Sequence, residues 1–471
     1  MERLNRIVIG ANASIFQKIN PKSNVEVFIP ENEEQIKEAI AFAREKKLPI
    51  TVKGGGSGMS GACTGASRDK VVISTMGLKR VHEINFEKNY AIVDPGITPD
   101  ELNEAIQQER ENWKFFVAPS SRDIATLGGI LGTDGGGNDA WLAGTMIDNV
   151  IEVELFDYNN NKIIVTRLND DFDNLTVIDN IPAKVTCENK EIEKQLLEKN
   201  FSLMDISGSH GVLGFVSRIK VRIKEIPYVE KQHYAIVNAK NLNAFGKVIY
   251  DLIENDIPLT YGEAIVEARH PDISGKTNPP MFILEYPEEF AAKMDIIFKN
   301  IPDIEFTFVD KEKFEVLKDI RIKMAKRNPP EGYQVALFEG YGVYDENLLR
   351  FDEIITEINK TLETHSFTPF IKFGHAPSIW HVGNEKIKGI IMHSREKRPE
   401  NMDREMVFNG IVALVETCDK LGVTPKPEHK WPYSKNTVKH KRLAELTEII
   451  GKEFNPFLLD CTLEELANLV L

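Results

Sequence analysis

The chain has 471 residues, enough for two or three domains with a large core. Its 42% hydrophobic and 28% charged residues are typical of a globular protein, and its net charge of −14 argues against a general nucleic-acid or polyanion binder. No run of about 18 apolar residues predicts a transmembrane segment, and the N-terminus lacks the apolar region of a secretion signal.

Strand-like and helix-like segments alternate in the first hundred residues. Residues 25–30 predict a strand, and Asn32 then begins a helix. The apolar positions of that helix fall on one face, which consists of Ile36, Ala39, Ile40 and Ala43. Further along we expect strands over residues 71–76 and 91–96, and a helix that begins at Thr98 and covers residues 102–108.

A glycine-rich segment, KGGGSGMSGACTG, covers Lys53–Gly65 and contains six glycines. It lies between the strand-like residues 48–52 and 71–74. Glycine adopts positive φ without a Cβ clash, so such a loop can direct several backbone N–H groups at one point. A group of N–H donors of this kind is an anion site, typically for phosphate. The alternative is a flexible loop without a function.

A second glycine-rich segment covers Pro119–Gly144, and the two segments together hold 13 of the 31 glycines. Apolar residues such as Ile124, Leu127 and Ile130 are interleaved with these glycines, which is not typical of a flexible linker. Two backbone cradles in one domain suggest a long ligand with a pyrophosphate in its middle.

The rest of the chain predicts a hairpin over residues 150–165, a third glycine turn that leads into a strand over residues 207–227, and a domain boundary at Pro227. An α+β module follows. Its predicted strands are residues 233–237, 280–285, 305–309, 335–344 and 370–375, the last ending on His375, and its predicted helices are residues 242–254, 287–300, 311–327 and 351–363. Two C-terminal helices are expected over residues 404–421 and 437–450, and no internal repeat is apparent.

Three motifs in order resemble the FAD-linked oxidases of the vanillyl-alcohol-oxidase type, and in particular the branch of the glycolate oxidase D-subunit, D-lactate dehydrogenase and D-2-hydroxyglutarate dehydrogenase. They are KGGGSGMSG from Lys53, PSS with TLGGILGTDGG from Pro119, and GSHGVLGFVS from Gly208. The resemblance implies an α+β fold: a two-lobed PCMH-type FAD-binding domain at residues 1–227, a ferredoxin-like cap domain at residues 228–395, and a C-terminal helical segment at residues 396–471 that completes the active site.

The resemblance also implies which residues hold FAD. Ser57 stands where some relatives attach the cofactor through His or Cys, so we expect non-covalent FAD, and we interpret Cys63 as structural. Lys53, Asp134 and His210 depart from the usual Arg, Asn and Glu, and Asp134 should weaken diphosphate binding unless it faces away or meets a cation. The predicted cofactor residues are Gly54, Gly55, Gly56, Ser57, Gly58, Met59, Ser60, Pro119, Ser121, Thr126, Gly128, Gly129, Gly132, Thr133, Gly135, Gly136, Gly211 and Val216.

Metal-using relatives hold a divalent ion with two His and a Glu, beside a catalytic His. His375, His381 and Glu428 match these ligands, which suit an ion such as Zn²⁺, and His429 matches the base. The spacing from His375 to His381 is one residue shorter than in the family, and the family's Asp-Gly-Asn is absent. The alternative is a set of scattered histidines, or a site that kept FAD and lost the metal.

Arg321 resembles the family's arginine that pairs with the substrate carboxylate. The alternative interpretation is an arginine on a solvated helix face.

We therefore predict FAD-dependent oxidation of a D-2-hydroxy acid such as lactate, glycolate or 2-hydroxyglutarate. The chain's four cysteines are far apart and form no CxxC motif, so electrons would pass to a separate iron–sulfur subunit or another acceptor. The same cysteine usage predicts a cytoplasmic protein. We further expect that any association with a membrane would be through a partner, and a homo-oligomer is left open. Two alternatives are a flavin-binding structural or electron-relay subunit with a degenerate site, and an oxidase of a sugar or another alcohol.

Overall fold

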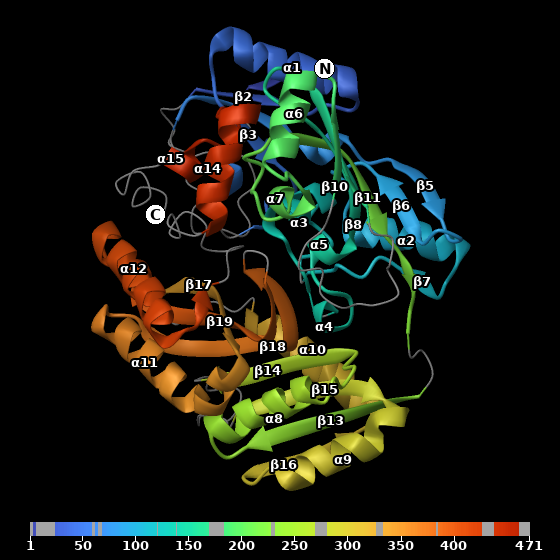
Figure 1. The fold of residues 1–471 in the computed structure, drawn as a ribbon. Helices are drawn as coiled ribbons and strands as arrows, with labels where there is room; N and C mark the ends of the chain where they lie inside the picture. Colours follow the sequence, from blue (N-terminus) through green and yellow to red (C-terminus); the bar gives the residue numbers. More distant parts are fainter. Residues whose placement is uncertain are drawn as a thin grey trace.

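The computed structural model describes residues 3–5, 24–58, 62–64, 68–119, 121–137, 139–168, 183–227, 231–268, 280–325, 333–382, 385–425 and 438–460. They form two bodies, one above the other in Figure 1. The N-terminal domain comprises the described residues up to 227, and the second domain those from 231 to 425. The last helices of the chain return to the N-terminal domain.

The first lobe of the N-terminal domain is a small, mostly parallel sheet in the order β1-β2-β4-β3. The predicted helix packs against it, with Asn32 accepting a hydrogen bond from the Gln35 N–H at 3.0 Å and the four expected apolar residues all buried. The elements are β1 (Arg3–Asn5), β2 (Val25–Phe28), α1 (Glu33–Lys46), β3 (Ile50–Lys53) and β4 (Lys70–Ser74).

The second lobe is a six-stranded antiparallel sheet in the order β10-β9-β8-β11-β6-β5, with β7 and β12 paired beside it. The strands are β5 (Val81–Asn85), β6 (Tyr90–Val93), β7 (Trp113–Lys114), β8 (Val150–Phe156), β9 (Lys162–Arg167), β10 (Ala183–Cys187), β11 (Phe215–Arg222) and β12 (Lys224–Glu225). The helices are α2 (Pro99–Glu109), α3 (Leu127–Thr133), α4 (Ala140–Ala143), α5 (Met146–Asn149), α6 (Lys190–Glu198) and α7 (Leu203–Ile206). The two-lobed arrangement expected from the sequence is therefore confirmed.

The second domain is one eight-stranded antiparallel sheet made of two halves with the same connectivity. Each half runs strand, helix, strand, strand, helix, strand, and its strands lie in the order fourth, first, third, second, which is the ferredoxin-like arrangement. The halves join where β14 pairs with β18. The chain thus contains a structural repeat that its sequence did not reveal.

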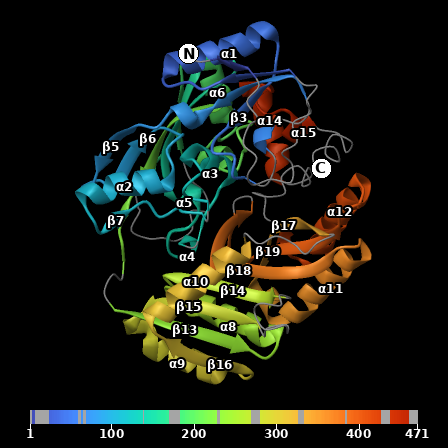
Figure 2. The ribbon, with the colours of Figure 1, turned by 180° about the vertical axis from the view of Figure 1, so that it is seen from behind.

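The first half contains β13 (Gln232–Ala239), α8 (Leu242–Glu254), β14 (Tyr261–Ala268), β15 (Met281–Pro287), α9 (Ala291–Asn300) and β16 (Ile304–Val309), and α10 (Lys311–Ala325) follows it. The second half contains β17 (Tyr333–Tyr344), α11 (Phe351–Thr364), β18 (Thr368–Val382), β19 (Glu385–Pro399), α12 (Arg404–Leu421) and β20 (Thr424–Pro425). In Figures 1 and 2, α10 lies at the height of β14 and β18.

Two expectations about the second half were wrong. The strand predicted to end on His375 continues to Val382, because a β-bulge between His375 and Ser378 absorbs the irregularity at Pro377. The boundary expected at residue 395 falls inside β19. Sequence analysis also missed β14 and β19, whose strands carry several charged residues among the apolar ones.

The C-terminal helices divide between the domains. α12 packs on α11, where the hydroxyls of Thr361 and Thr417 lie 3.0 Å apart. α14 (Val438–Ile450) and α15 (Phe457–Asp460) lie against the N-terminal domain (Figure 1). There the chain beside Phe454 extends the first sheet, since the N–H of Ile50 donates to the Glu453 carbonyl at 2.8 Å and the Asn455 N–H donates to the Ile50 carbonyl at 2.7 Å.

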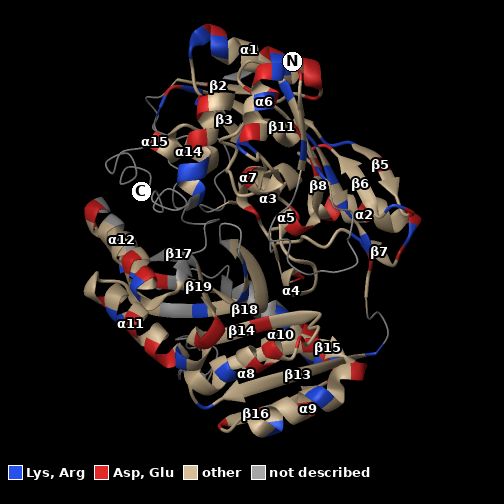
Figure 3. Cartoon of the chain, viewed as in Figure 1, with Lys and Arg blue, Asp and Glu red and all other residues tan. Residues whose placement is uncertain are grey.

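Acidic and basic residues are distributed over the helices and strands of both domains (Figure 3). Across the described ranges, no helix is long and apolar enough to cross a membrane.

Candidate cofactor site

The first two glycine segments contact each other closely, backbone against backbone. A Cβ at Gly54 would overlap the hydroxyl of Thr126, and one at Gly55 would overlap the carbonyl group of Ile124. Both positions therefore need glycine because of close approach, and not because of an unusual φ. The two segments, separated by residues 66–118 of the sequence, form one continuous surface.

The third glycine segment closes on the same surface. A Cβ at Gly132 would lie 3.7 Å from the Cα of His210 and 3.8 Å from the Gly211 nitrogen. Gly211, at a φ of +74°, approaches the side chain of Val52, whose Cβ would be 3.3 Å from a Cβ at this position. The strand before the first segment, the helix of the second and the turn of the third thus meet, as a shared ligand requires.

A cation lies within the first loop. Gly56 has a φ of +72°, and a Cβ there would overlap the ammonium group of Lys53. The lysine that replaces the family's arginine therefore folds back over the glycines, where it can neutralise part of a diphosphate. The Cys63 thiol feels the same ammonium, although burial dominates and raises its pKa. A raised pKa disfavours the thiolate, which fits a structural cysteine.

Helix α3 fixes the second loop. Thr126 accepts a hydrogen bond from the Gly129 N–H at 3.3 Å, and the Thr133 hydroxyl donates to the Gly129 carbonyl at 3.2 Å. Of the other predicted residues, Gly128 lies in α3, Gly135 and Gly136 follow it, Pro119 and Ser121 precede it, Ser57 and Gly58 follow Gly56 in the first loop, and Val216 lies in β11. Met59 and Ser60 lie outside the described residues.

Asp134, which replaces the family's Asn, is held by three donors at the end of α3. Its Oδ1 accepts from the Ile147 N–H at 2.9 Å and from the hydroxyls of Thr145 and Ser207 at 3.0 Å. Its Oδ2 lies 3.8 Å from Nδ1 of His381. The carboxylate is therefore engaged by local donors and faces an imidazole, and it also interacts electrostatically with the ammonium of Lys439, which is a cation of the kind expected to offset its charge.

His381 bridges the two domains. It comes from β18, and its other ring nitrogen, Nε2, lies 3.5 Å from Oδ1 of Asp148 in α5. The imidazole thus stands between two carboxylates of the N-terminal domain.

His375 has a different partner, within the second domain. Its Nδ1 lies 3.1 Å from Oε2 of Glu263, the residue directly opposite on β14. The His393 ring stands edge-on to it, with the ring centroids 5.4 Å apart. Glu263 is fully buried, and a buried carboxylate beside an imidazole fixes the orientation of the ring. Sequence analysis missed Glu263 and His393; an acid within an otherwise apolar strand, IPLTYGEAIV, is the signal that could have found Glu263.

The described residues do not bring the predicted metal ligands together. His375 and His381 contact different carboxylates, and within the described ranges no three His, Cys, Asp or Glu side chains could hold a metal ion. Glu428 and His429 lie outside the described residues. Arg321 lies in α10, but its side chain is not described. That helix packs Phe314 against Tyr261 of β14, two residues from Glu263, with the ring centroids 5.5 Å apart.

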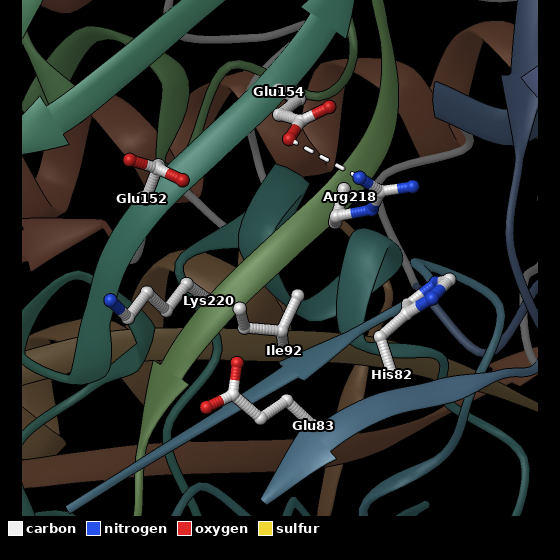
Figure 4. A pocket seen from close by; sticks show the side chains of 7 residues that line it. All are labelled: His82, Glu83, Ile92, Glu152, Glu154, Arg218 and Lys220. Carbon is white, nitrogen blue, oxygen red and sulfur yellow. Dashed lines mark ion pairs between the residues drawn. The ribbon is translucent and has the colours of Figure 1, made fainter. Parts of the chain in front are cut away.

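A small hollow of about 220 Å³ lies on the six-stranded sheet (Figure 4). Acidic side chains from β8 and basic ones from β11 stand beside each other, with Arg218 3.5 Å from Glu154. Lys162 joins the same group through Glu154 at 3.4 Å and Glu33 at 2.7 Å. These contacts pair opposite charges across neighbouring strands, so we interpret the hollow as a salt-bridged sheet surface and not as the cofactor site.

Comparison with known proteins agrees with this geometry. Residues 26–167 match the family described as FAD binding domain. This range contains the first two glycine segments, α3 and Asp134. The residues that meet around the loops fit a diphosphate-linked flavin, since two glycine backbones approach each other there and the Lys53 ammonium lies beside Gly56.

Curated relatives share part of the chain. A D-lactate dehydrogenase of Archaeoglobus fulgidus is 32% identical over 28% of this chain and 28% of its own length. Glycolate oxidase subunit GlcD of Bacillus subtilis is 25% identical over 48% of this chain and 42% of its own length. The chain thus spans less than half the length of these two relatives in the alignments. Among solved structures, an alkyldihydroxyacetonephosphate synthase has a TM-score of 0.62 at 15% identity, over 91% of this chain and 76% of its own, which shows a common fold.

Proposed function

Because residues 26–167 carry the FAD-binding domain that the FAD-linked oxidases share, we propose that the chain is a flavoenzyme that oxidises a D-2-hydroxy acid to the 2-oxo acid. The observation that carries the proposal is the convergence of the three glycine segments around Gly54, Thr126 and Gly211. The names of the relatives, a D-lactate dehydrogenase and a glycolate oxidase subunit, support the choice of substrate class.

The reaction removes a hydride from the α-carbon and a proton from the hydroxyl, and FAD supplies the hydride acceptor. We propose that the flavin is non-covalent, because Ser57 replaces the residue to which covalent flavins attach in relatives. The reduced cofactor would pass its electrons to a separate acceptor, such as an iron–sulfur subunit.

The chain's own residues would then do two things. A base must take the hydroxyl proton, and a cation must hold the carboxylate. We propose His429 as the base and Arg321 as the carboxylate partner, on the motif match alone. His375 lies 3.1 Å from Glu263 of β14, and α10, which carries Arg321, packs on the same strand through Phe314 and Tyr261. These contacts support a substrate site on this face of the second domain.

The test is an anaerobic screen of 2-hydroxy acids on the purified, FAD-loaded chain, which follows the loss of flavin absorbance. We expect a D-2-hydroxy acid to bleach the flavin, and His429→Ala to slow the bleaching by two to four orders of magnitude, since that is the usual contribution of a general base (roughly 10²–10⁴). Metal content measured in parallel decides whether His375 and Glu428 hold an ion. An unbleached flavin with every acid of the panel would contradict the proposal.

A second candidate is a flavin-binding subunit that relays electrons and has no substrate of its own. The contact of His381 with Asp134 and Asp148 favours it, because this histidine lies beside two carboxylates of the N-terminal domain and does not share a partner with His375. A chain that holds FAD, contains no metal, and is reduced only when a partner protein is added would support this candidate.

A further inference from the structure

A cavity of about 380 Å³ lies between the two domains, and the end of the second glycine segment, at Trp141, Leu142 and Ala143, lines part of it. Phe116 and Trp141 line it from the N-terminal domain, and Pro258 and Ile379 from the second domain. The indole N–H of Trp141 donates to the Ile257 carbonyl at 2.6 Å, which fixes the ring at the boundary. The volume falls within the range of small-molecule pockets, about 300–1,000 Å³.

Basic side chains dominate the polar part of this cavity. Four cationic residues line it, against two acidic ones. Asp256 lies 3.3 Å from Lys388, which also stands 5.5 Å from the centre of the Trp141 ring. The cavity is therefore locally positive in a chain whose net charge is −14, which favours an anionic occupant. The cationic residues are Arg222, Lys224, Lys386 and Lys388, and the acidic ones are Glu225 and Asp256.

A second guanidinium stands behind the cavity wall. Arg222 and Arg167 are both buried, at 4% and 3% exposure, and they repel each other electrostatically. Arg167 donates to the Ile147 carbonyl, while its Nε and Nη1 have no hydrogen-bond partner among the described residues. Burial, reinforced by Arg222 and opposed by Asp148, lowers the pKa of Arg167 to about 10, so the side chain remains charged at neutral pH. Arg222 lines the cavity, and the charge of Arg167, although partly offset by Asp148, repels it, so an anion bound at Arg222 relieves this repulsion.

We propose that this interdomain cavity binds an organic anion with an apolar body. Its acidic group would lie toward Arg222 and the lysines of β19, and its ring or hydrocarbon part against Trp141 and Phe116. None of the residues predicted to hold FAD lines the cavity, so the proposed anion site uses other side chains of the N-terminal domain.

The site also spans the domain boundary. Occupation would join β12 and α4 of one domain to β18 and β19 of the other, because residues of all four elements line the cavity. An anion held there therefore stabilises the contact between the domains by its own binding free energy.

The experiment is a fluorescence titration of the FAD-loaded chain with anilinonaphthalene sulfonate, an anion with an aromatic body. We expect one saturable site per chain, energy transfer from tryptophan that Trp141→Phe reduces, since Trp141 is the tryptophan that lines the cavity among the described residues, and affinity that falls as salt is added. The double variant Lys386→Met with Lys388→Met should weaken binding at least tenfold. The matched control, Lys79→Met with Lys360→Met, removes the same charge from two exposed lysines in ion pairs with Glu101 and Glu357, and should bind like the parent.

An uncharged probe separates charge from hydrophobicity. Phenylnaphthylamine has the same aromatic body without the acid, and we expect it to bind at least tenfold more weakly than the sulfonate. Equal affinity of the two probes, equal affinity of the two double variants, or failure of the sulfonate to saturate a single site would each overturn the proposal. Melting temperatures of the variants without probe show whether a loss of binding is a loss of folding.

Discussion

The contact between the first two glycine segments can be tested by adding one methyl group at Gly55. Gly55→Ala would place a methyl group inside the carbonyl of Ile124, 2.8 Å from its carbon and 3.4 Å from the Cα of Ala125. The obstacle is backbone and cannot rotate away, so the loops must separate. Gly58→Ala is the matched control in the same loop, because a Cβ there meets no atom of the described residues within 4 Å and the substitution keeps the main-chain N–H that Gly58 would offer to FAD.

Overpacking of this kind costs about 1–3 kcal/mol. If the separation falls on the cradle, the dissociation constant of FAD rises about five- to 150-fold. Gly58→Ala should stay within about twofold of the parent, as expected for a change within about 0.5 kcal/mol. The assay is a titration of flavin-stripped protein with FAD, followed by flavin fluorescence, with melting curves of the apo forms. Should Gly55→Ala bind FAD as tightly as Gly58→Ala, the two segments do not form one cradle.

Three further outcomes follow from the structure. Burial lowers the pKa of Lys439 to about 8, so between pH 8 and the usual lysine pKa near 10.5 the folded state binds fewer protons than the unfolded state. Urea unfolding should therefore show that the parent gains stability relative to Lys439→Met as the pH rises through this window, by roughly 3 kcal/mol at most. The same dependence of the unfolding free energy on pH in both proteins would contradict the assignment. Phe454→Ala empties a position at 1% exposure where the C-terminal segment joins the first sheet, and should lower the unfolding free energy by about 3–5 kcal/mol, against little change for the exposed Phe308→Ala. Glu396→Ala removes the carboxylate 2.9 Å from the fully buried Lys372 and should lower the unfolding free energy by about 3–5 kcal/mol. The double variant Glu396→Leu with Lys372→Met leaves no unpaired buried charge and should recover most of the lost stability. A double variant as unstable as the single one would show that the unpaired Lys372 does not cause the loss.

The sequence predicted well those features that depend on local chemistry. The helix after Asn32 and the helix over residues 242–254 follow from caps and apolar spacing, and both lie where they were expected. The glycine segments were visible in the composition and were interpreted as anion-binding loops with positive φ, whereas at Gly54 and Gly55 the close approach of two backbones is what requires glycine.

Features that depend on pairing between distant strands were not predictable. β14 and β19 bury charged residues such as Glu263 and Glu396 against partners on other strands, so their sequences lack the alternation that signals a half-buried strand. The partners of His381 were missed for the same reason, since Asp134 and Asp148 belong to another domain. The contacts of Glu428, His429 and the Arg321 side chain stay predictions.

The duplicated sheet determines how the pair of Glu263 and His375 can form. Glu263 is contributed by the first circuit of strands and His375 by the second, and they meet only along the seam of β14 and β18. Neither circuit alone can present the pair. A chain in which one half is still unfolded therefore lacks the pair, so the pair forms only when the whole second domain has folded.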